Sequence, residues 1–467
     1  MHILKCSYMG FLLANCQVIS SAVAQDPFHS SFSYGDPNEL GHDKRIPPNN
    51  ALNSVNLVRS MNQYRKERAG RGVNARQAWM SVDIATIQKN FKIYQRALKP
   101  TVCAAVLKSN AYGFGAAKIA PALYSVGARH FFVSTIPEAI EIAAAIANVP
   151  ERDLVSAIND NANKRVPSYD KSGYNIFVLS RCSDDWLSMY KFKFIPSLNS
   201  LNEVHRYNEF AKSQKEVLPA VLHIDTGMNS YAVNPRDFSK FCTSHKNCEF
   251  KFIEWRYFMS HPVSMDPENY TSGVQRQRVL GIRGMFPNIP FSFASSYWTK
   301  YGLSTGRDWL FDMVRIGSGL YGIGECLDGV KFCAKLKVKI LQIQDVPKDV
   351  PVGYESNYIP QHDMRIAIIA CGYQQGLMHN GDVRIGRDTA SIIDLCQNTA
   401  FVDVTHIKNV TTCDVASIEG EHLRTCAEMH CRSIETGIER VWIEDSFTRD
   451  ESTETVSPPT TPSVHEK

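Results

Sequence analysis

Short apolar runs alternate with amphipathic segments between residues 79 and 325. The runs have the length of strands, and in the segments between them apolar residues recur every three or four positions, as on one face of a helix. Such runs occur at 101–108, 130–134, 174–180, 217–225, 252–260 and 289–295. Strands that alternate with helices build parallel sheets, and the segment has roughly the 250 residues typical of a (β/α)8 barrel. We therefore predict this TIM-barrel fold, with a doubly wound open sheet as the alternative.

The pattern changes near residue 326. Runs rich in β-branched residues are separated there by Gly, Pro, Asn and Asp rather than by long helical segments; they lie at 330–346, 365–373, 382–386 and 400–407. β-branched residues favour strands, and the separating residues favour turns. We therefore expect an α/β protein in which a barrel domain, residues 79–325, is followed by a mainly β C-terminal domain, residues 326–445.

The two ends of the chain lack the pattern of a folded domain. Residues 1–24 combine basic residues, an apolar core and small residues at the end, as a secretory signal peptide does. Residues 25–78 begin with a Pro-, Gly- and Asn-rich stretch and predict a linker and N-terminal extension, whereas 446–467 predict a disordered tail. With a functional signal the protein is exported, to the periplasm or out of the cell, and without one it is cytoplasmic.

Charge and composition exclude some classes of partner. The 467 residues include 51 basic and 47 acidic ones, scattered along the chain with a net charge of +4, so we expect no nucleic-acid surface. Beyond residue 24 no apolar run approaches the roughly 18 residues of a membrane span, so we expect no membrane partner. Among 13 cysteines, the cluster of Cys426, His430 and Cys431 has no second ligand pair, and we expect no metal site.

Polar side chains stand where the predicted barrel strands end. They are Lys108, Asp225, His261, Ser295 and Ser296. Any one of them alone is usually structural, but in a barrel all strands end at one mouth, where active sites lie. Because burying this many polar groups without a purpose is costly, we interpret them together as candidate functional residues. Lys108 is the candidate nucleophile, since desolvation can make an amine neutral and reactive.

Three motifs resemble the alanine racemase family, fold-type III enzymes that depend on pyridoxal 5'-phosphate. They are LKSNAYGFG at 107–115, DMVRIGSGLYG at 312–322 and PVGYESNY at 351–358, and they occur in the family's order. The resemblance covers roughly residues 79–445. It implies a barrel that binds the cofactor, a second domain, and racemisation of a small amino-acid substrate, alanine or a broader range.

The resemblance also implies the cofactor site. Lys108 attaches the cofactor covalently, Tyr112 binds its phosphate, and Ser296 with the backbone around Gly317 and Ser318 completes the phosphate site. Arg315 matches the family's arginine that faces the ring nitrogen. Because arginine stays protonated, it only donates to that nitrogen. The ring is then a weaker electron sink, which favours racemisation over transamination.

Racemisation requires proton transfer on both faces of the substrate's α-carbon. By the resemblance, Lys108 serves one face and Tyr354 the other, with His261 and Arg315 lined up behind the tyrosine. A phenol with a pKa near 10 needs such help to act as a base at neutral pH. The family takes this tyrosine from the other subunit of a head-to-tail dimer, so we expect a homodimer with shared active sites.

Several positions depart from the family's pattern and leave other activities open. Ser230 stands where an arginine is usual, Gln375 replaces an aspartate, and Gln397 with Asn398 replaces a Met-Asp pair. The broad-specificity branch tends to have a disulfide at the position of Cys103, but the expected partner position is near His130. The alternatives are a catalytically degenerate cofactor-binding protein of this fold and another fold-type III enzyme.

Overall fold

The computed structural model describes residues 77–153, 155, 173–179, 185–266, 268–377, 381–420, 423–424 and 439–443. The predicted signal peptide (1–24), nearly all of the predicted extension (25–78) and the predicted tail (446–467) lie outside these residues. The cysteine and histidine cluster at 426–431 also lies outside them.

Eight parallel strands close into a barrel, which confirms the predicted TIM-barrel class. The barrel closes where the last strand pairs with the first. Its strands are β2 (Val102–Val106), β3 (His130–Val133), β4 (Asn175–Val178), β5 (Ile195–Leu198), β6 (Leu218–His223), β7 (Ile253–Met259), β8 (Phe291–Ser295) and β9 (Met313–Ile316). The prediction lacked β5 and β9. Both have only four residues, and polar side chains at Ser197 and Arg315 interrupt their apolar pattern.

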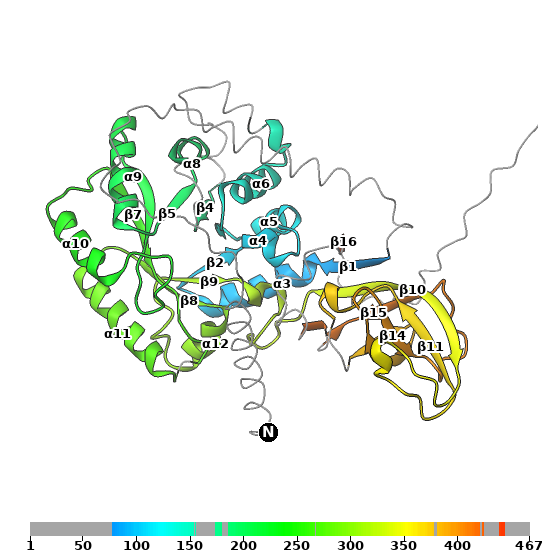
Figure 1. Ribbon diagram of the computed structural model, residues 1–467. Helices are drawn as coiled ribbons and strands as arrows, with labels where there is room; N and C mark the ends of the chain where they lie inside the picture. Colours follow the sequence, from blue (N-terminus) through cyan, green and yellow to red (C-terminus); the bar gives the residue numbers. More distant parts are fainter. Residues whose placement is uncertain are drawn as a thin grey trace, which may run out of the picture. The chain divides into compact units, whose positions relative to one another are not determined.

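Helices surround the barrel strands (Figure 1). They are α3 (Ile84–Leu98), α4 (Lys108–Tyr112), α5 (Ala116–Ser125), α6 (Ile136–Ala147), α8 (Trp186–Phe192), α9 (Leu201–Gln214), α10 (Pro235–Lys246), α11 (Tyr270–Met285) and α12 (Ser296–Ser304). Alternation along the strands separates two apolar layers. Ala104 and Val106 of β2 pack with Phe132, Phe177 and Met259 inside the barrel, whereas Ala105 and Phe131 belong to the larger core.

A second, eight-stranded sheet forms the C-terminal domain, as predicted, and its pairings are antiparallel except that between β1 and β16. Its strands are β1 (Ala78–Asp83), β10 (Ala334–Val346), β11 (Met364–Ile369), β12 (Asp382–Ile385), β13 (Asp388–Leu395), β14 (Ala400–Asp403), β15 (Val415–Ile418) and β16 (Glu439–Ile443). The strand β1 opens the range 79–325 expected for the barrel, yet it pairs with β10 and β16. Because β1 is followed by a helix, it has the same local pattern as a strand of the barrel. Only its long-range pairing with β10 and β16 shows that it belongs to the second sheet.

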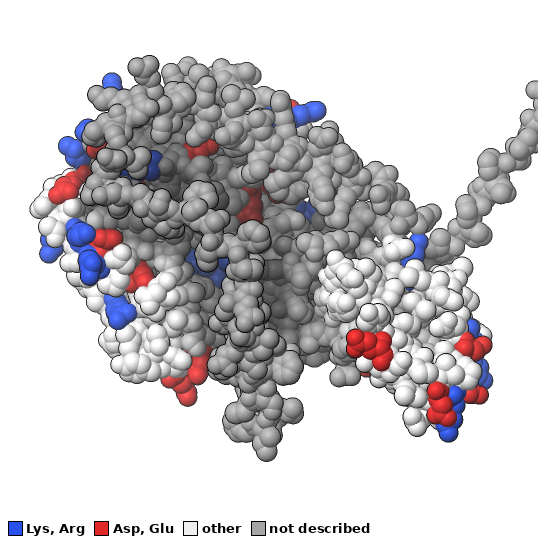
Figure 2. Space-filling view, in the orientation of Figure 1, with Lys and Arg blue, Asp and Glu red and all other residues white. Residues whose placement is uncertain are grey.

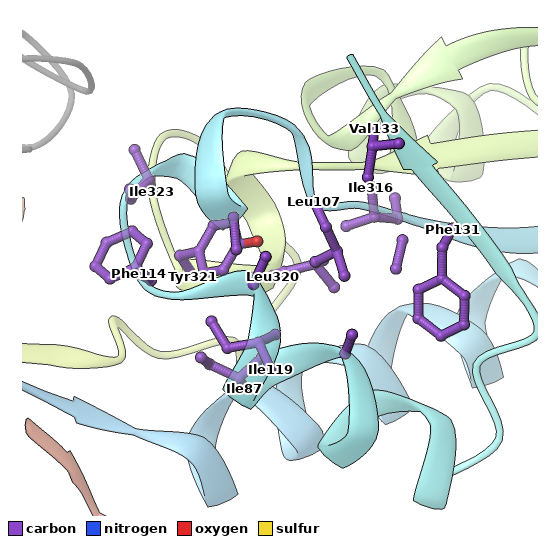
Figure 3. Close-up of a cluster of buried hydrophobic side chains, with 14 of the residues drawn as sticks. Ile87, Leu107, Phe114, Ile119, Phe131, Val133, Ile316, Leu320, Tyr321 and Ile323 are labelled. Carbon is purple, nitrogen blue, oxygen red and sulfur yellow. The ribbon is translucent and has the colours of Figure 1, made fainter. Parts of the chain in front are cut away.

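The ends of β2 and β9 are anchored in one apolar cluster (Figure 3). Leu107 precedes Lys108, and Ile316 follows Arg315. Both side chains are fully buried in this cluster with Leu320. Burying side chains of this kind stabilises the fold by about 1.5–3 kcal/mol each. Lys108 and Arg315, which adjoin these two buried residues in the chain, are therefore held in fixed positions at the mouth.

The described surface has charges of both signs. On the face seen in Figure 2, the described basic and acidic side chains are interspersed. Over the residues that the structure describes, no helix is both long and apolar enough to cross a membrane. The same residues contain no group of three or more His, Cys, Asp or Glu placed to hold a metal ion.

Candidate active site

Lys108 stands at the start of a left-handed turn that follows β2. Residues 109–112 have φ angles of 53–56°. A left-handed conformation costs about 1–2 kcal/mol for each non-glycine residue, so a run of this kind needs support from outside. Gly113, with φ of 84°, ends the turn at no such cost.

Glu138, in the first turn of α6, supplies the support. Its Oε1 accepts hydrogen bonds from the N–H groups of Ser109 (2.6 Å) and Asn110 (3.3 Å). Its Oε2 accepts from the N–H groups of Ser134 (2.8 Å) and Thr135 (3.2 Å). One carboxylate thus joins the segments that follow β2 and β3 and fixes the turn that presents the lysine.

Arg315 is a buried cation in the barrel mouth. Its Nη1 donates to the carbonyl (3.1 Å) and the hydroxyl (2.6 Å) of Ser292, and its Nη2 donates to the carbonyl of Ser260 (2.6 Å). Burial lowers the pKa of the guanidinium to about 10, which leaves it protonated at neutral pH. The side chain is therefore a fixed positive group that can only donate hydrogen bonds.

His261 lies beside this cation. Nη2 of Arg315 approaches its Nδ1 to 3.4 Å. Because arginine only donates, Nδ1 is the acceptor, and the proton of the neutral ring is on Nε2. Desolvation, followed by the positive charges of Arg315 and Lys108, lowers the pKa of the imidazole. Although the surrounding groups desolvate the ring, much of the residue's surface remains exposed, so a group that approaches the mouth can reach it.

Ser296, Gly317 and Tyr112 converge on one small cup. The hydroxyl of Ser296, at the start of α12, accepts from the N–H groups of Gly317 (2.9 Å) and Gly319 (3.1 Å). A Cβ on Gly317 would lie 2.1 Å from the hydroxyl oxygen of Tyr112, so only glycine fits there. Ser318 begins the 3₁₀ turn η3 (Ser318–Tyr321). Hydroxyls and backbone N–H groups gathered in this way form an anion site.

Two of the predicted mouth residues have structural roles. Oδ1 of Asp225 accepts from three successive backbone N–H groups, at 227–229 (2.8, 3.0 and 3.1 Å), and so shapes the loop after β6. Ser295 is the N-cap residue of α12, and its carbonyl accepts from the hydroxyl of Thr299 (3.0 Å). These contacts account for both residues without a role in chemistry.

His223, at the end of β6, adds a second neutral imidazole. Its Nδ1 lies 3.1 Å from Oδ1 of Asn199. Desolvation and the positive charge of Arg315 lower its pKa to about 4. Since both histidines are uncharged at neutral pH, Arg315 and Lys108 give the mouth a positive potential that suits an anionic ligand.

Tyr354 is separate from these groups within one chain. It lies in η4 (Tyr354–Ser356), on a loop whose ends, Val352 and Tyr358, exchange two backbone hydrogen bonds (2.8 and 3.4 Å). The residue is 74% exposed. Among the described residues, no hydrogen bond joins it to His261 or Arg315. The barrel thus brings together every predicted site residue except this tyrosine.

Of the residues that depart from the family's pattern, those in the second domain form an amide cluster. Nε2 of Gln375 donates to Oδ1 of Asn398 (3.0 Å), and Nε2 of Gln397 donates to Oε1 of Gln374 (3.1 Å). These amides link the segment after β11 to the segment after β13. Ser230 is exposed in the loop after β6.

Three supporting residues were absent from the sequence prediction: Glu138, Gln275 and Ser292. Gln275 is fully buried, and its Nε2 donates to the carbonyl of His261 (3.0 Å) and to the hydroxyl of Thr226 (3.1 Å). The spacing of Thr135 and Glu138 is that of a capping box, which predicts a helix start. That spacing does not predict that the carboxylate of Glu138 reaches the segment after β2. The sequence did not settle whether Cys103 forms a disulfide. In the structure Cys103 is a free, buried thiol.

Comparisons with known proteins agree with this geometry. The family described as alanine racemase, N-terminal domain, matches residues 82–325, and the alanine racemase C-terminal domain matches residues 333–440. The alanine racemase of Brucella suis is 28% identical over 318 residues, covering 64% of this chain and 73% of that protein. That of Rickettsia peacockii is 26% identical over 335 residues, covering 70% and 85%.

A solved structure extends the likeness to three dimensions. The alanine racemase from Bartonella henselae, with covalently bound pyridoxal phosphate, is 25% identical. The match covers 79% of this chain and 100% of that chain, with a TM-score of 0.66. On the two domain matches and the shared fold, this chain belongs to the alanine racemase family, whose members are amino-acid racemases.

Proposed function

We propose that this chain binds pyridoxal 5'-phosphate covalently through Lys108 and interconverts the enantiomers of alanine or of a broader range of small amino acids. The observation that carries the proposal is the convergence of a lysine, an anion cup and a buried arginine on one mouth. Lys108, Ser296 and Arg315 come from the ends of three different barrel strands. Chemistry in this fold is placed at that end of the strands.

The residues present fit this cofactor. A phosphate needs several donors in a small space, and the hydroxyls of Ser296 and Tyr112 with the N–H groups of Gly317 and Gly319 supply them. The two N–H groups already converge on one oxygen, that of Ser296, which is the arrangement that a phosphate oxygen requires. Arg315 offers a donor to a ring nitrogen that has a lone pair.

The cofactor supplies an electrophilic carbon for covalent attachment and an electron-withdrawing ring that acidifies the substrate's α-hydrogen. The chain supplies the proton transfers. Lys108 is the base on one face of the α-carbon, and Tyr354 is the base on the other. Arg315 holds its charge beside the ring and does not protonate it, so a proton returns readily to the α-carbon.

His261 prepares Tyr354 for its role. Its neutral ring has the proton on Nε2, because Nδ1 faces the guanidinium of Arg315. This N–H can donate to a phenolate oxygen and so stabilise the deprotonated tyrosine. Because the pKa of His261 is lowered, the ring stays a neutral donor throughout the neutral pH range.

We further propose a homodimer in which each active site takes Tyr354 from the partner subunit. Tyr354 is exposed and makes no hydrogen bond to the barrel residues that it should serve. The loops after β6 and β7 and the start of α11 expose large apolar side chains, of which Met265 is 70% and Tyr270 86% exposed. Exposed apolar side chains gathered in one region are typical of interaction surfaces. A second copy of the chain covers them and completes the site.

The test is a panel of L- and D-amino acids incubated with the cofactor-loaded protein in deuterated water. Exchange at the α-carbon and the enantiomer ratio are followed together. We expect exchange accompanied by loss of enantiomeric purity, greatest for alanine or other small side chains. Lys108→Ala should abolish covalent attachment of the cofactor, whereas Lys118→Ala, an exposed lysine on α5, should not. Bound cofactor without exchange or inversion would indicate the degenerate alternative.

A further inference from the structure

Asp394 is a buried carboxylate that the proposed mechanism does not use. It lies on β13 and is 1% exposed, and its Oδ2 has no hydrogen-bond partner among the residues that the structure describes. Leaving a buried polar atom unpaired costs roughly 1–3 kcal/mol, and more for a charged group. A cost of this kind calls for a role other than stability.

The unpaired oxygen lies against the backbone of Gly353. A Cβ built on Gly353 would be 1.7 Å from Oδ2 of Asp394, which is far inside van der Waals contact. Gly353 also has φ of 85° and ψ of −178°, a conformation that residues with side chains rarely adopt. Both constraints require glycine, and both place the carboxylate directly against this turn.

A bulge in β13 aims adjacent side chains at the same loop. The register between β13 and β14 shifts between Ile392 and Asp394, so residues 393 and 394 need not point to opposite faces. Ile393 packs against the small apolar cluster under the loop, which comprises Val346, Val352, Met364 and Ile366 with Tyr358 and Phe401. Thus β13 contacts the loop at its base through Ile393 and near its tip through Asp394.

The tip of this loop carries the proposed second base. Gly353 immediately precedes Tyr354, whose side chain makes no hydrogen bond to any described residue. The backbone contacts at Val352 and Tyr358 hold the loop's base, whereas the carboxylate of Asp394 lies against the residue that directly precedes the tyrosine. Proton transfer requires hydrogen-bond distance, and an error of about 1 Å in placement can cost two orders of magnitude in rate.

We propose that Asp394 is a positioning residue for Tyr354. Its carboxylate fills the space beside Gly353 and fixes the direction in which the phenol leaves the loop. This inference rests on the proposed function of Tyr354 as the second base. It predicts that the shape of the side chain at position 394 matters for proton transfer at one face of the substrate only.

The experiment uses the full-length, cofactor-loaded protein with Asp394→Ala and Asp394→Asn, each alone and combined with Tyr354→Phe. Asp382→Ala, an exposed carboxylate on the neighbouring strand β12, is the matched control. The readouts are the initial rates of deuterium entry at the α-carbon from each enantiomer and the rate of racemisation. Urea unfolding of each variant separates loss of the fold from loss of position.

We expect Asp394→Ala to slow racemisation about tenfold by misplacing one base. The loss should appear with the enantiomer whose α-hydrogen faces Tyr354, while exchange at the Lys108 face stays within about twofold. Asp394→Asn, which keeps the shape, should retain most of the rate. In the Tyr354→Phe background Asp394→Ala should cost nothing more, because both changes act through one residue.

The inference would be overturned if Asp394→Ala slowed exchange equally from both enantiomers or if its effect added fully to that of Tyr354→Phe. A defect in Asp394→Asn as large as that in Asp394→Ala would also overturn it. An Asp394→Ala variant as active as Asp382→Ala would do the same. If Tyr354→Phe itself changed neither exchange rate, the proposed second base would be wrong, and the inference would be lost with it. The Tyr354→Phe measurement therefore distinguishes the two failures.

Discussion

Ser296 shows how one side chain prepares the anion cup. Its hydroxyl accepts from two buried backbone N–H groups, those of Gly317 and Gly319, and so satisfies both before any ligand binds. A phosphate can take over these donors without movement of the backbone. The serine thus holds both N–H groups in place for a ligand, which lowers the cost of binding.

Replacing this serine should affect the free protein more than the loaded protein. In Ser296→Ala the two N–H groups lose their acceptor, so the cofactor-free protein should lose roughly 1–3 kcal/mol of unfolding free energy. With saturating pyridoxal 5'-phosphate the loss should shrink, because phosphate oxygens accept from the same groups. Urea unfolding with and without cofactor measures both values, and Ser304→Ala on the same helix is the control. Equal losses in the two states would contradict this role for the cup.

At the scale of elements, the sequence predicted what depends on local pattern and failed where long-range contacts decide. Lys108, Tyr112, Arg315 and Gly317 lie in motifs and Ser296 ends an apolar run, and the structure brings all five together at the barrel mouth. The strand β1 was not predicted, and its residues fell in the range expected for the barrel, because its partners lie more than 250 residues away, in β10 and β16. Nothing in the apolar pattern indicates a left-handed turn at 109–112, since its stability comes from a carboxylate on another element.

The support of the left-handed turn at 109–112 by Glu138 can be tested directly. Glu138→Gln keeps the size of the side chain, but its Nε2 cannot accept, so two of the four N–H groups lose their partner. The turn should loosen, and the lysine and Tyr112 should lose their fixed placement. Cofactor affinity should then fall about tenfold, which corresponds to about 1.4 kcal/mol. Titration of the cofactor-free protein with pyridoxal 5'-phosphate checks this, with Glu209→Gln, an exposed residue of α9, as control. Unchanged affinity would show that the turn holds without the carboxylate.

In one copy of the chain, the two parts of the proposed active site are not joined. The barrel holds Lys108, His261 and Arg315, whereas Tyr354 stands exposed on a loop of the second domain. Ile393 of β13 packs against the apolar cluster at the base of that loop, and Val352 and Tyr358 exchange backbone hydrogen bonds there. A loop braced in this way at its base, with an exposed tip, suits insertion into another subunit, because little further ordering is needed on assembly.

Shared sites predict that two variants, each deficient in racemisation, restore activity when mixed. In a head-to-tail dimer of Lys108→Ala with Tyr354→Phe, one site has both defects and the other has neither. Random exchange of equal amounts makes half of the dimers mixed, so about a quarter of the original activity should return. The variants are unfolded and refolded together, and racemisation is compared with that of each variant refolded alone. A chain with both substitutions, refolded with the Lys108→Ala chain, is the control and should stay inactive. If each chain instead used its own tyrosine, every site in the mixture would have one defect and no activity would return.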